Sequence, residues 1–203
     1  VIFTQSFANV PAGGEAPFSF SDANAAVGMV TYDASTNLGG LARDDAPTVV
    51  HEPVELTDAV LRALERARRR AGDVEFVPML MPWTLMGDST ALERAVLNLL
   101  DNAAKWSPPN GKVRVQMRQL DEWSLVLEVA DAGPGISAKD LPHIFDRFYR
   151  ADTSRTMSGS GLGLAIVRQV ALRHGGAVWA GRAPEGGALM VLRLPGRRPP
   201  SGG

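Results

Sequence analysis

The chain has 203 residues, of which 45% are apolar and 21% charged, values typical of a folded protein rather than a disordered one. Its formal net charge of −1 provides no overall field that would recruit nucleic acid or a membrane surface. The absence of cysteine excludes disulfides, cysteine-ligated zinc and thiol nucleophiles. No apolar run reaches the roughly 18 residues of a membrane span, and no signal peptide is recognisable, so we expect a soluble chain.

Composition divides the chain into unequal parts. Residues 1–46 hold five acidic residues, one base and five of the thirteen aromatic residues, without a long helical period. Short strands or an irregular arm are both compatible with that composition, and we assign the segment no role. The sharper signals lie in 47–196, which we interpret as one domain, and 197–203 is expected to be a flexible tail.

The first regular element of that domain is a helix. Leu56, Val60, Leu61 and Leu64 recur at helical spacing, and arginines surround them. The arginines favour a solvated helix face, with a docking patch as the alternative. A strand is expected next, over 74–80.

A longer helix is expected from the cap residues at 88–90 to about Trp106. Thr90 and Glu93 have the spacing of a capping box. The helix should stop at 107–111, where two prolines, an asparagine and a glycine follow a serine.

Four strands and one more helix complete the domain. Alternating apolar residues predict strands over 112–119 and 124–131, and two further strands near 177–182 and 187–194. Between these pairs a helix is expected over about 162–173. Short links imply antiparallel pairing, and helices on one face of such a sheet define an α+β fold.

The expected helix at 89–106 carries a polar line. Asn98, Asn102 and Lys105 lie within roughly 60° of one another around the helix axis. Carboxamide oxygens suit Mg²⁺, and a lysine suits phosphate. A solvated polar face would show the same pattern. On this polar line alone, the solvated face is the favoured interpretation. The opposite, apolar face is the expected core side: Leu92, Val96, Leu99 and Ala103.

Residues 131–135 read Asp-Ala-Gly-Pro-Gly. By strand alternation Asp131 falls on the same face as Leu125 and Val129, and a carboxylate in an apolar wall needs a hydrogen-bond donor. An adenine amino group is such a donor, and Gly133 and Gly135 would let the backbone approach a flat ring. A turn in which Asp131 bonds its own backbone is the alternative.

Two further segments carry phosphate-binding character. Residues 159–164 read Gly-Ser-Gly-Leu-Gly-Leu before a helix, where free amides bind phosphate, although the spacing is neither a P-loop nor a Rossmann fingerprint. Residues 144–152 offer aromatic anchors and arginines for a lid over phosphates, with 153–158 as its mobile part. An ordinary loop pinned by two phenylalanines is the alternative.

In this order the four segments resemble the N, G1, F and G2 boxes of the histidine-kinase ATP-binding domain. That domain has the Bergerat fold shared with gyrase, Hsp90 and MutL. The resemblance covers about residues 47–196 and is to actinobacterial sensor kinases of the MprB type. It implies a two-layer α+β sandwich with helices packed on one face of a mixed, mostly antiparallel sheet. It also implies ATP and Mg²⁺ as ligands and transfer of the γ-phosphoryl group to a histidine.

The resemblance implies a role for each matched position. Asn102 would hold Mg²⁺ with a contribution from Asn98, and Lys105 would contact phosphate. The expected catalytic residues are Asn98, Lys105 and Arg147, the last at the γ-phosphate.

The nucleotide would be held by residues from all four boxes. Asp131 would accept from the adenine amino group, and Trp106 occupies a position where the family often places an aromatic residue beside the ring. The other expected binding positions are Gly133, Gly135, Phe145, Phe148, Gly159, Gly161, Leu162 and Gly163.

Two features depart from the family or its superfamily. No phosphoacceptor motif surrounds His51, His143 or His174, the last of which reads as a helix terminus, so we expect little self-phosphorylation. The implied partner is a separate dimerisation and phosphoacceptor domain, with a response regulator as an indirect partner. Related ATPases place a glutamate where this chain has Asn98, and a carboxamide cannot accept a proton from water.

The resemblance thus predicts the cytosolic part of a membrane-anchored kinase that holds ATP until a histidine arrives. One alternative is a single-domain regulator resembling anti-sigma-factor kinases, which phosphorylate serine on a partner. A second is a degenerate domain that binds nucleotide only to control docking.

Overall fold

A computed structural model of the protein describes residues 52–151, 159–184 and 186–199. The predictions for residues 1–46, for His51 and for 153–158 fall outside these ranges.

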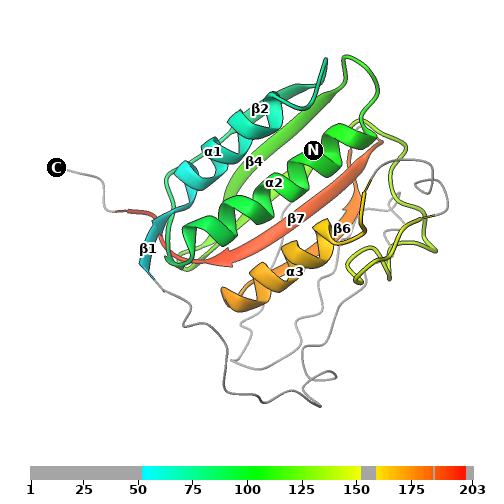
Figure 1. Cartoon of the computed structure of the whole chain (residues 1–203). Helices are drawn as coiled ribbons and strands as arrows, with labels where there is room; N and C mark the ends of the chain where they lie inside the picture. Colours follow the sequence, from blue (N-terminus) through cyan, green and yellow to red (C-terminus); the bar gives the residue numbers. More distant parts are fainter. Residues whose placement is uncertain (1–51, 152–158, 185, 200–203) are drawn as a thin grey trace, which may run out of the picture.

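The described residues form a two-layer sandwich, with three α-helices side by side on one face of a five-stranded sheet (Figure 1). The helices are α1 (Leu56–Arg68), α2 (Ser89–Trp106) and α3 (Gly163–Arg173). The strands, in spatial order, are β2 (Glu75–Met79), β4 (Lys112–Asp121), β5 (Ser124–Ala130), β7 (Ala188–Pro195) and β6 (Ala177–Arg182). β2 and β4 are parallel and the other neighbours antiparallel, so the predicted fold class is confirmed.

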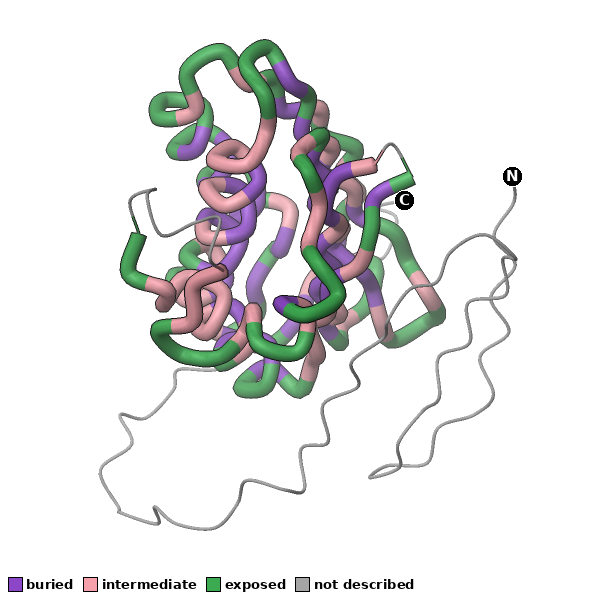
Figure 2. The backbone as a smooth tube through the Cα atoms, turned by 90° about the vertical axis from the view of Figure 1, so that its right-hand side faces the viewer, coloured by how far each residue is buried: buried purple, intermediate pink, exposed green. Residues whose placement is uncertain are grey.

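The hydrophobic core lies between the helices and the sheet. Leu92, Val96, Leu99 and Ala103 of α2 are buried, as their helical spacing predicts. The alternating residues of the central strands meet them from the sheet side and are also buried: Val113, Val115, Met117, Leu125, Leu127 and Val129. Buried positions run through the middle of the molecule, whereas the turns at its ends are largely exposed (Figure 2).

A second, two-stranded sheet had no clear signal in the sequence. β1 (Glu52–Glu55) pairs antiparallel with β3 (Thr84–Gly87), and β3 leads directly into α2. Thr84 also exchanges two backbone hydrogen bonds with Arg197, each 2.9 Å long. Ordered pairing therefore continues one residue beyond the boundary at 196 that the sequence suggests.

The N-terminus of α2 differs from the sequence prediction. Asp88 is the cap residue, and its side chain accepts a hydrogen bond from the Ala91 amide at 3.0 Å. Thr90 therefore lies inside the helix, and the capping box predicted for Thr90 and Glu93 is wrong. The carboxylate of Glu93 points to α1, because Arg62 and Arg66 pair with it at 3.0 and 2.9 Å.

The C-terminus of α3 is tied to the N-terminus of α2 through a buried histidine. His174 Nε2 accepts the Asp88 amide hydrogen at 3.0 Å, which leaves the ring proton on Nδ1, and Nδ1 donates to the Val170 carbonyl at 2.8 Å. His174 also caps α3, which confirms its interpretation as a helix terminus. None of the helices in the described ranges is long and apolar enough to cross a membrane.

Candidate functional site

The site lies at the end of the molecule where α2 finishes and α3 begins (Figure 1). The described residues of the long connection between β5 and α3, 131–151 and 159–162, lie at the same end. All four motifs that the sequence singled out therefore meet in one region, although they are spread over more than sixty residues of sequence, from 98 to 163.

Asn98 begins the polar line of α2 and faces the start of α3. A Cβ atom at Gly163 would lie 3.3 Å from Asn98 Oδ1, a tight contact, so the glycine keeps the Asn98 side chain close to α3 without crowding it. Asn98 Nδ2 is buried and has no hydrogen-bond partner among the described residues. A buried amide without a partner costs free energy, which a ligand that accepts its hydrogen would recover.

Lys105 is the last residue of the polar line. It lies near Gly159, and the charge of Arg150 acts on it. A Cβ atom at Gly159 would lie 3.4 Å from Lys105 Nζ. Burial lowers the pKa of Lys105, and the positive charge of Arg150 lowers it further. An anion bound near both cations would relieve their repulsion.

Asp131 follows β5 directly and is 97% buried, with 3% of its surface exposed. Its Oδ1 atom accepts from the amides of Gly133 at 2.9 Å and Ala188 at 3.0 Å. Burial raises the pKa of Asp131, while these two hydrogen bonds oppose the rise. Within the described residues, the structure gives Oδ2 no hydrogen bond. The turn considered for Asp131 is therefore made by Oδ1, and it leaves Oδ2 as an acceptor for the adenine contact that the sequence predicts.

The glycines around Asp131 are needed for close packing. A side chain at Gly133 would overlap the carbonyl group of Trp106, which brings the end of α2 against this turn. A side chain at Gly187 would overlap the carbonyl of Asp131 itself. Gly187 belongs to the β6–β7 connection, whereas the sequence indicated it only as the first residue of the expected strand 187–194. The structure makes it part of the site.

The aromatic-arginine segment is joined to the start of α3. The Phe148 amide donates to the Gly161 carbonyl at 3.0 Å. Gly161 has φ +71°, and a Cβ atom there would lie 2.8 Å from the Tyr149 carbonyl oxygen. Phe145 packs against the core, whereas Phe148 is 70% exposed.

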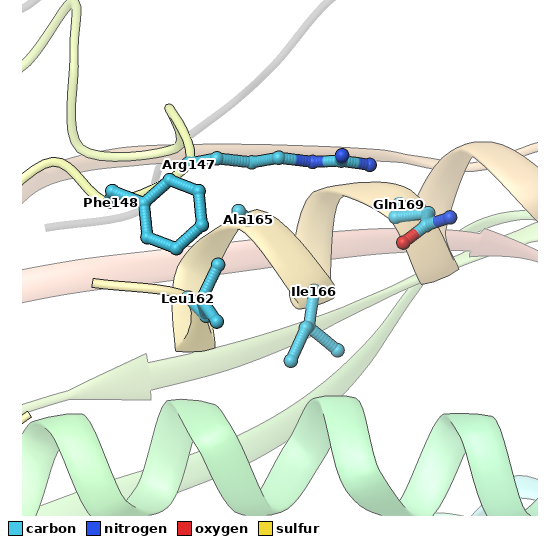
Figure 3. A pocket seen from close by; sticks show the side chains of 6 residues that line it. All are labelled: Arg147, Phe148, Leu162, Ala165, Ile166 and Gln169. Atoms are coloured by element: carbon cyan, nitrogen blue, oxygen red, sulfur yellow. The ribbon is translucent and has the colours of Figure 1, made fainter. Parts of the chain in front are cut away.

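Three of the expected site residues line a pocket beside α3. Arg147, Phe148 and Leu162 line a shallow pocket of about 190 Å³ on the outside of α3, with Ala165, Ile166 and Gln169. Arg147 extends along α3 in the direction of Gln169 (Figure 3). The arginine whose charge acts on Lys105 is Arg150. The sequence offered both arginines, and nothing in their spacing distinguished them.

Known proteins resemble this chain in both sequence and structure. Residues 87–198 match the family described as histidine kinase-, DNA gyrase B- and HSP90-like ATPases, and the chain belongs to that family. A signal transduction histidine-protein kinase/phosphatase, MprB of Mycolicibacterium paratuberculosis, is 53% identical over 172 residues, which cover 82% of this chain and 33% of that protein. The chain thus spans about a third of the length of the curated relatives it matches.

Solved structures agree with this assignment. A mycobacterial sensor histidine kinase MprB superposes with a TM-score of 0.68 at 49% identity, covering 74% of this chain and all of that one (100%). The ATP-binding domain of PrrB from Mycobacterium tuberculosis superposes with a TM-score of 0.60 at 30% identity, covering 72% of this chain and 98% of that one.

Proposed function

We propose that this chain is the ATP-binding catalytic part of a two-component sensor histidine kinase, which transfers the γ-phosphoryl group of ATP to a histidine on a dimerisation helix. The observation that carries the proposal is the convergence of both glycine segments on α2. Gly133 packs against Trp106, Gly163 against Asn98 and Gly159 against Lys105. The names of the similar proteins support the same activity.

The two ends of this region suit the two ends of ATP, because one offers an acceptor for the adenine and the other offers positive charge for the phosphates. Asp131 Oδ2 is the acceptor for the adenine amino group, since Oδ1 is already taken by two amides. At the other end, Lys105 and Arg150 provide positive charge for the phosphates. The amides at the start of α3 add donors of the kind that bind phosphate at a helix N-terminus.

Mg²⁺ fits the carboxamides of α2 when it is shared with phosphate. The described residues contain no cluster of three His, Cys, Asp or Glu side chains that would hold a metal by themselves. Mg²⁺ is commonly bound through one or two protein oxygens together with substrate phosphates and water. Asn102, with Asn98, would provide those oxygens, and the ion would neutralise charge on the phosphates.

The residues around the phosphates favour transfer over hydrolysis. Asn98 stands where a water-activating glutamate would be needed, and a carboxamide cannot accept a proton. The chain's contribution to transfer is then to hold ATP in line with an incoming histidine and to stabilise the phosphate charge.

The partner that this function requires is a dimerisation and phosphoacceptor domain. The pocket outside α3 lies beside the G2 segment and contains the exposed Phe148, an aromatic anchor of the kind found at protein interfaces. Arg147 and Leu162 line the same pocket, so we assign them to this docking surface, and the nucleotide contacts that the sequence suggested for them stay a prediction. In a full-length kinase of this kind, the domain belongs to the cytosolic part of a membrane-anchored protein, and a response regulator receives the phosphoryl group in a later step.

Calorimetry and a transfer assay test the function together. The chain should bind ATP more tightly with Mg²⁺ than with EDTA, and Asn102→Ala should remove that difference while adenosine affinity stays unchanged. An isolated histidine-kinase hairpin should be labelled from radioactive ATP by the chain, and much more slowly by Asn102→Ala. A normal transfer rate in that variant would contradict the metal role of Asn102.

The same assay separates histidine from serine transfer. Phosphohistidine is labile in acid and stable in base, whereas phosphoserine is stable in acid. Acid-stable label on a serine of a partner would instead support the regulator resembling anti-sigma-factor kinases. Nucleotide binding without transfer to any hairpin would support a degenerate domain.

A further inference from the structure

Asp140 fixes the loop that precedes the G2 segment. It is a buried carboxylate, and Tyr149 Oη donates to its Oδ1 at 2.7 Å while Ser137 Oγ donates to its Oδ2 at 2.5 Å. The Asp140 amide also donates to the Ser137 carbonyl at 3.0 Å. The hydrogen bonds from Ser137 and then Tyr149 lower the pKa of Asp140, which therefore stays ionised at neutral pH.

Tyr149 is the residue that this carboxylate holds in place. Its ring packs against His143 with centroids 5.4 Å apart, and its amide donates to the Asp146 carbonyl at 3.3 Å. The residue before it, Phe148, has a left-handed backbone with φ +64° and is tied to Gly161. A non-glycine residue in that conformation persists only where its surroundings fix it.

The residue after Tyr149 is Arg150, whose charge is felt at Lys105. Hydrogen bonds at Phe148 and Tyr149 thus fix the backbone on the N-terminal side of Arg150. A cation on a fixed backbone loses less conformational freedom when it binds an anion than one on a loose loop.

We propose that the Tyr149–Asp140 hydrogen bond holds Arg150 beside Lys105, so that Tyr149 and Asp140 are positioning residues for the nucleotide phosphates. Neither side chain needs to touch the nucleotide. This inference rests on the proposed function, because Arg150 has a phosphate to bind only if ATP occupies the site.

Tyr149→Phe removes this hydrogen bond and keeps the ring. With the 203-residue chain, calorimetry should show MgATP binding weakened about tenfold, equivalent to ~1.4 kcal/mol, and adenosine binding unchanged. Thr57→Val is the matched control, because it removes a partly buried hydrogen bond of 2.8 Å to the Met81 carbonyl outside the site. That control should lower the melting temperature without changing either affinity.

Two further variants show whether the effect passes through Arg150. In an Arg150→Met background, Tyr149→Phe should cause no additional loss of MgATP affinity. Asp140→Asn keeps an oxygen that accepts from Tyr149, so it should retain most of the affinity that Asp140→Ala loses. The dependence on Arg150 and the unchanged adenosine affinity exclude a purely structural role, because a structural loss would be independent of Arg150 and would extend to adenosine.

The outcomes separate this inference from the function on which it depends. If the unaltered chain binds neither MgATP nor adenosine, the proposed function fails. If it binds MgATP and Tyr149→Phe binds equally well, the positioning role is wrong. The role is also wrong if adenosine is weakened as much as MgATP, or if the Arg150→Met background shows the same tenfold loss.

Discussion

Asp131 has two carboxylate oxygens in different surroundings, and this difference determines how a substitution should act. Oδ1 accepts from two backbone amides, so in Asp131→Asn the single remaining oxygen would stay with those amides. The new NH₂ group would then face the adenine amino group, and two donors cannot bond each other. We expect ATP affinity to fall at least about tenfold, or ~1.4 kcal/mol, in a calorimetric titration.

A matched control for this change is Asp121→Asn. Asp121 accepts from Trp123 and Ser124 in the turn between β4 and β5, outside the nucleotide site. ATP affinity should be unaltered there. Equal affinities for the Asp131 variant and the unaltered chain would refute the adenine contact.

The pH dependence of binding follows from the same residue. Burial raises the pKa of Asp131, and an adenine amino group needs the ionised form as acceptor. ATP affinity should therefore decline on acidification, and the decline should begin at a higher pH than it would for an aspartate with an ordinary pKa. This decline should be absent in Asp131→Asn. The stability of the fold depends on pH in the opposite sense. The folded chain holds the proton of Asp131 more tightly than the unfolded chain, so the contribution of Asp131 to the free energy of unfolding is largest below its unfolded pKa. That contribution is lost as the pH rises through the folded value.

At the scale of elements, α1 and α2 are joined by arginines that pair with acidic residues. Glu93 forms salt bridges with both Arg62 and Arg66, and Arg70 forms one with Asp101 at 3.3 Å. The arginine side chains are about half exposed, between 47% and 59%, so the solvated face expected from the sequence also forms contacts between helices.

We predict a small, pH-dependent loss of stability in Glu93→Gln. The hydrogen bond from Arg66 is the largest cause of the lowered pKa of Glu93, so the folded state favours the ionised form. The stability this provides is present above the unfolded pKa and is lost as the pH falls through the folded value. Because the arginines are partly solvated, chemical denaturation at pH 7 should show a loss of about 0.5–1 kcal/mol, shrinking in acid.

Glu75→Gln is the control for this measurement. Its pair with Lys112 is 3.2 Å long but lies in solvent, with side chains 60% and 71% exposed. The free energy of unfolding should hardly change in that variant. If both variants behave alike, the bridge between α1 and α2 makes no net contribution.

Some elements could be predicted from the pattern of neighbouring residues in the sequence, and others could not. The apolar spacing of Leu92, Val96 and Leu99 was sufficient to predict α2, because a helix face repeats along the chain. β1 and β3 have four residues each and depend on each other for pairing, so no local pattern identified them. The cap at Asp88 was misassigned because 88–90 contains three cap-forming residues in a row.

The site was predictable in its parts and less so in its arrangement. The glycine segments and the polar line are readable from residue types. The choice between Arg147 and Arg150 depends on how the backbone turns at Phe148, where φ is +64°. The contact between Gly187 and Asp131 joins residues fifty-six positions apart in sequence (187 − 131), and nothing in the sequence brought them together.

For the whole molecule, the histidines bear on the expected lack of self-phosphorylation. His174 is buried with both ring nitrogens hydrogen-bonded, and His143 Nδ1 pairs with Asp146 at 3.1 Å in an exposed turn. Neither belongs to a helix that could present it to a second domain. His51 lies outside the described ranges.

We therefore expect the chain with radioactive ATP to remain unlabelled, and an added histidine-kinase hairpin to become labelled on its histidine. Mass spectrometry of a sample kept at basic pH, where phosphohistidine is stable, would identify the labelled residue. Efficient labelling of His51 in the chain alone would contradict the separation of acceptor and catalytic parts.

The contact between Gly187 and the Asp131 carbonyl sets a limit on how this domain can vary. In a library randomised over 186–188 and selected for nucleotide capture, position 187 should retain glycine alone. Alanine is the smallest alternative, and its methyl group would already displace Asp131. The tolerance of the β6–β7 connection to mutation is thus limited by its packing against Asp131, although the connection leads to the strand at the edge of the sheet, β6.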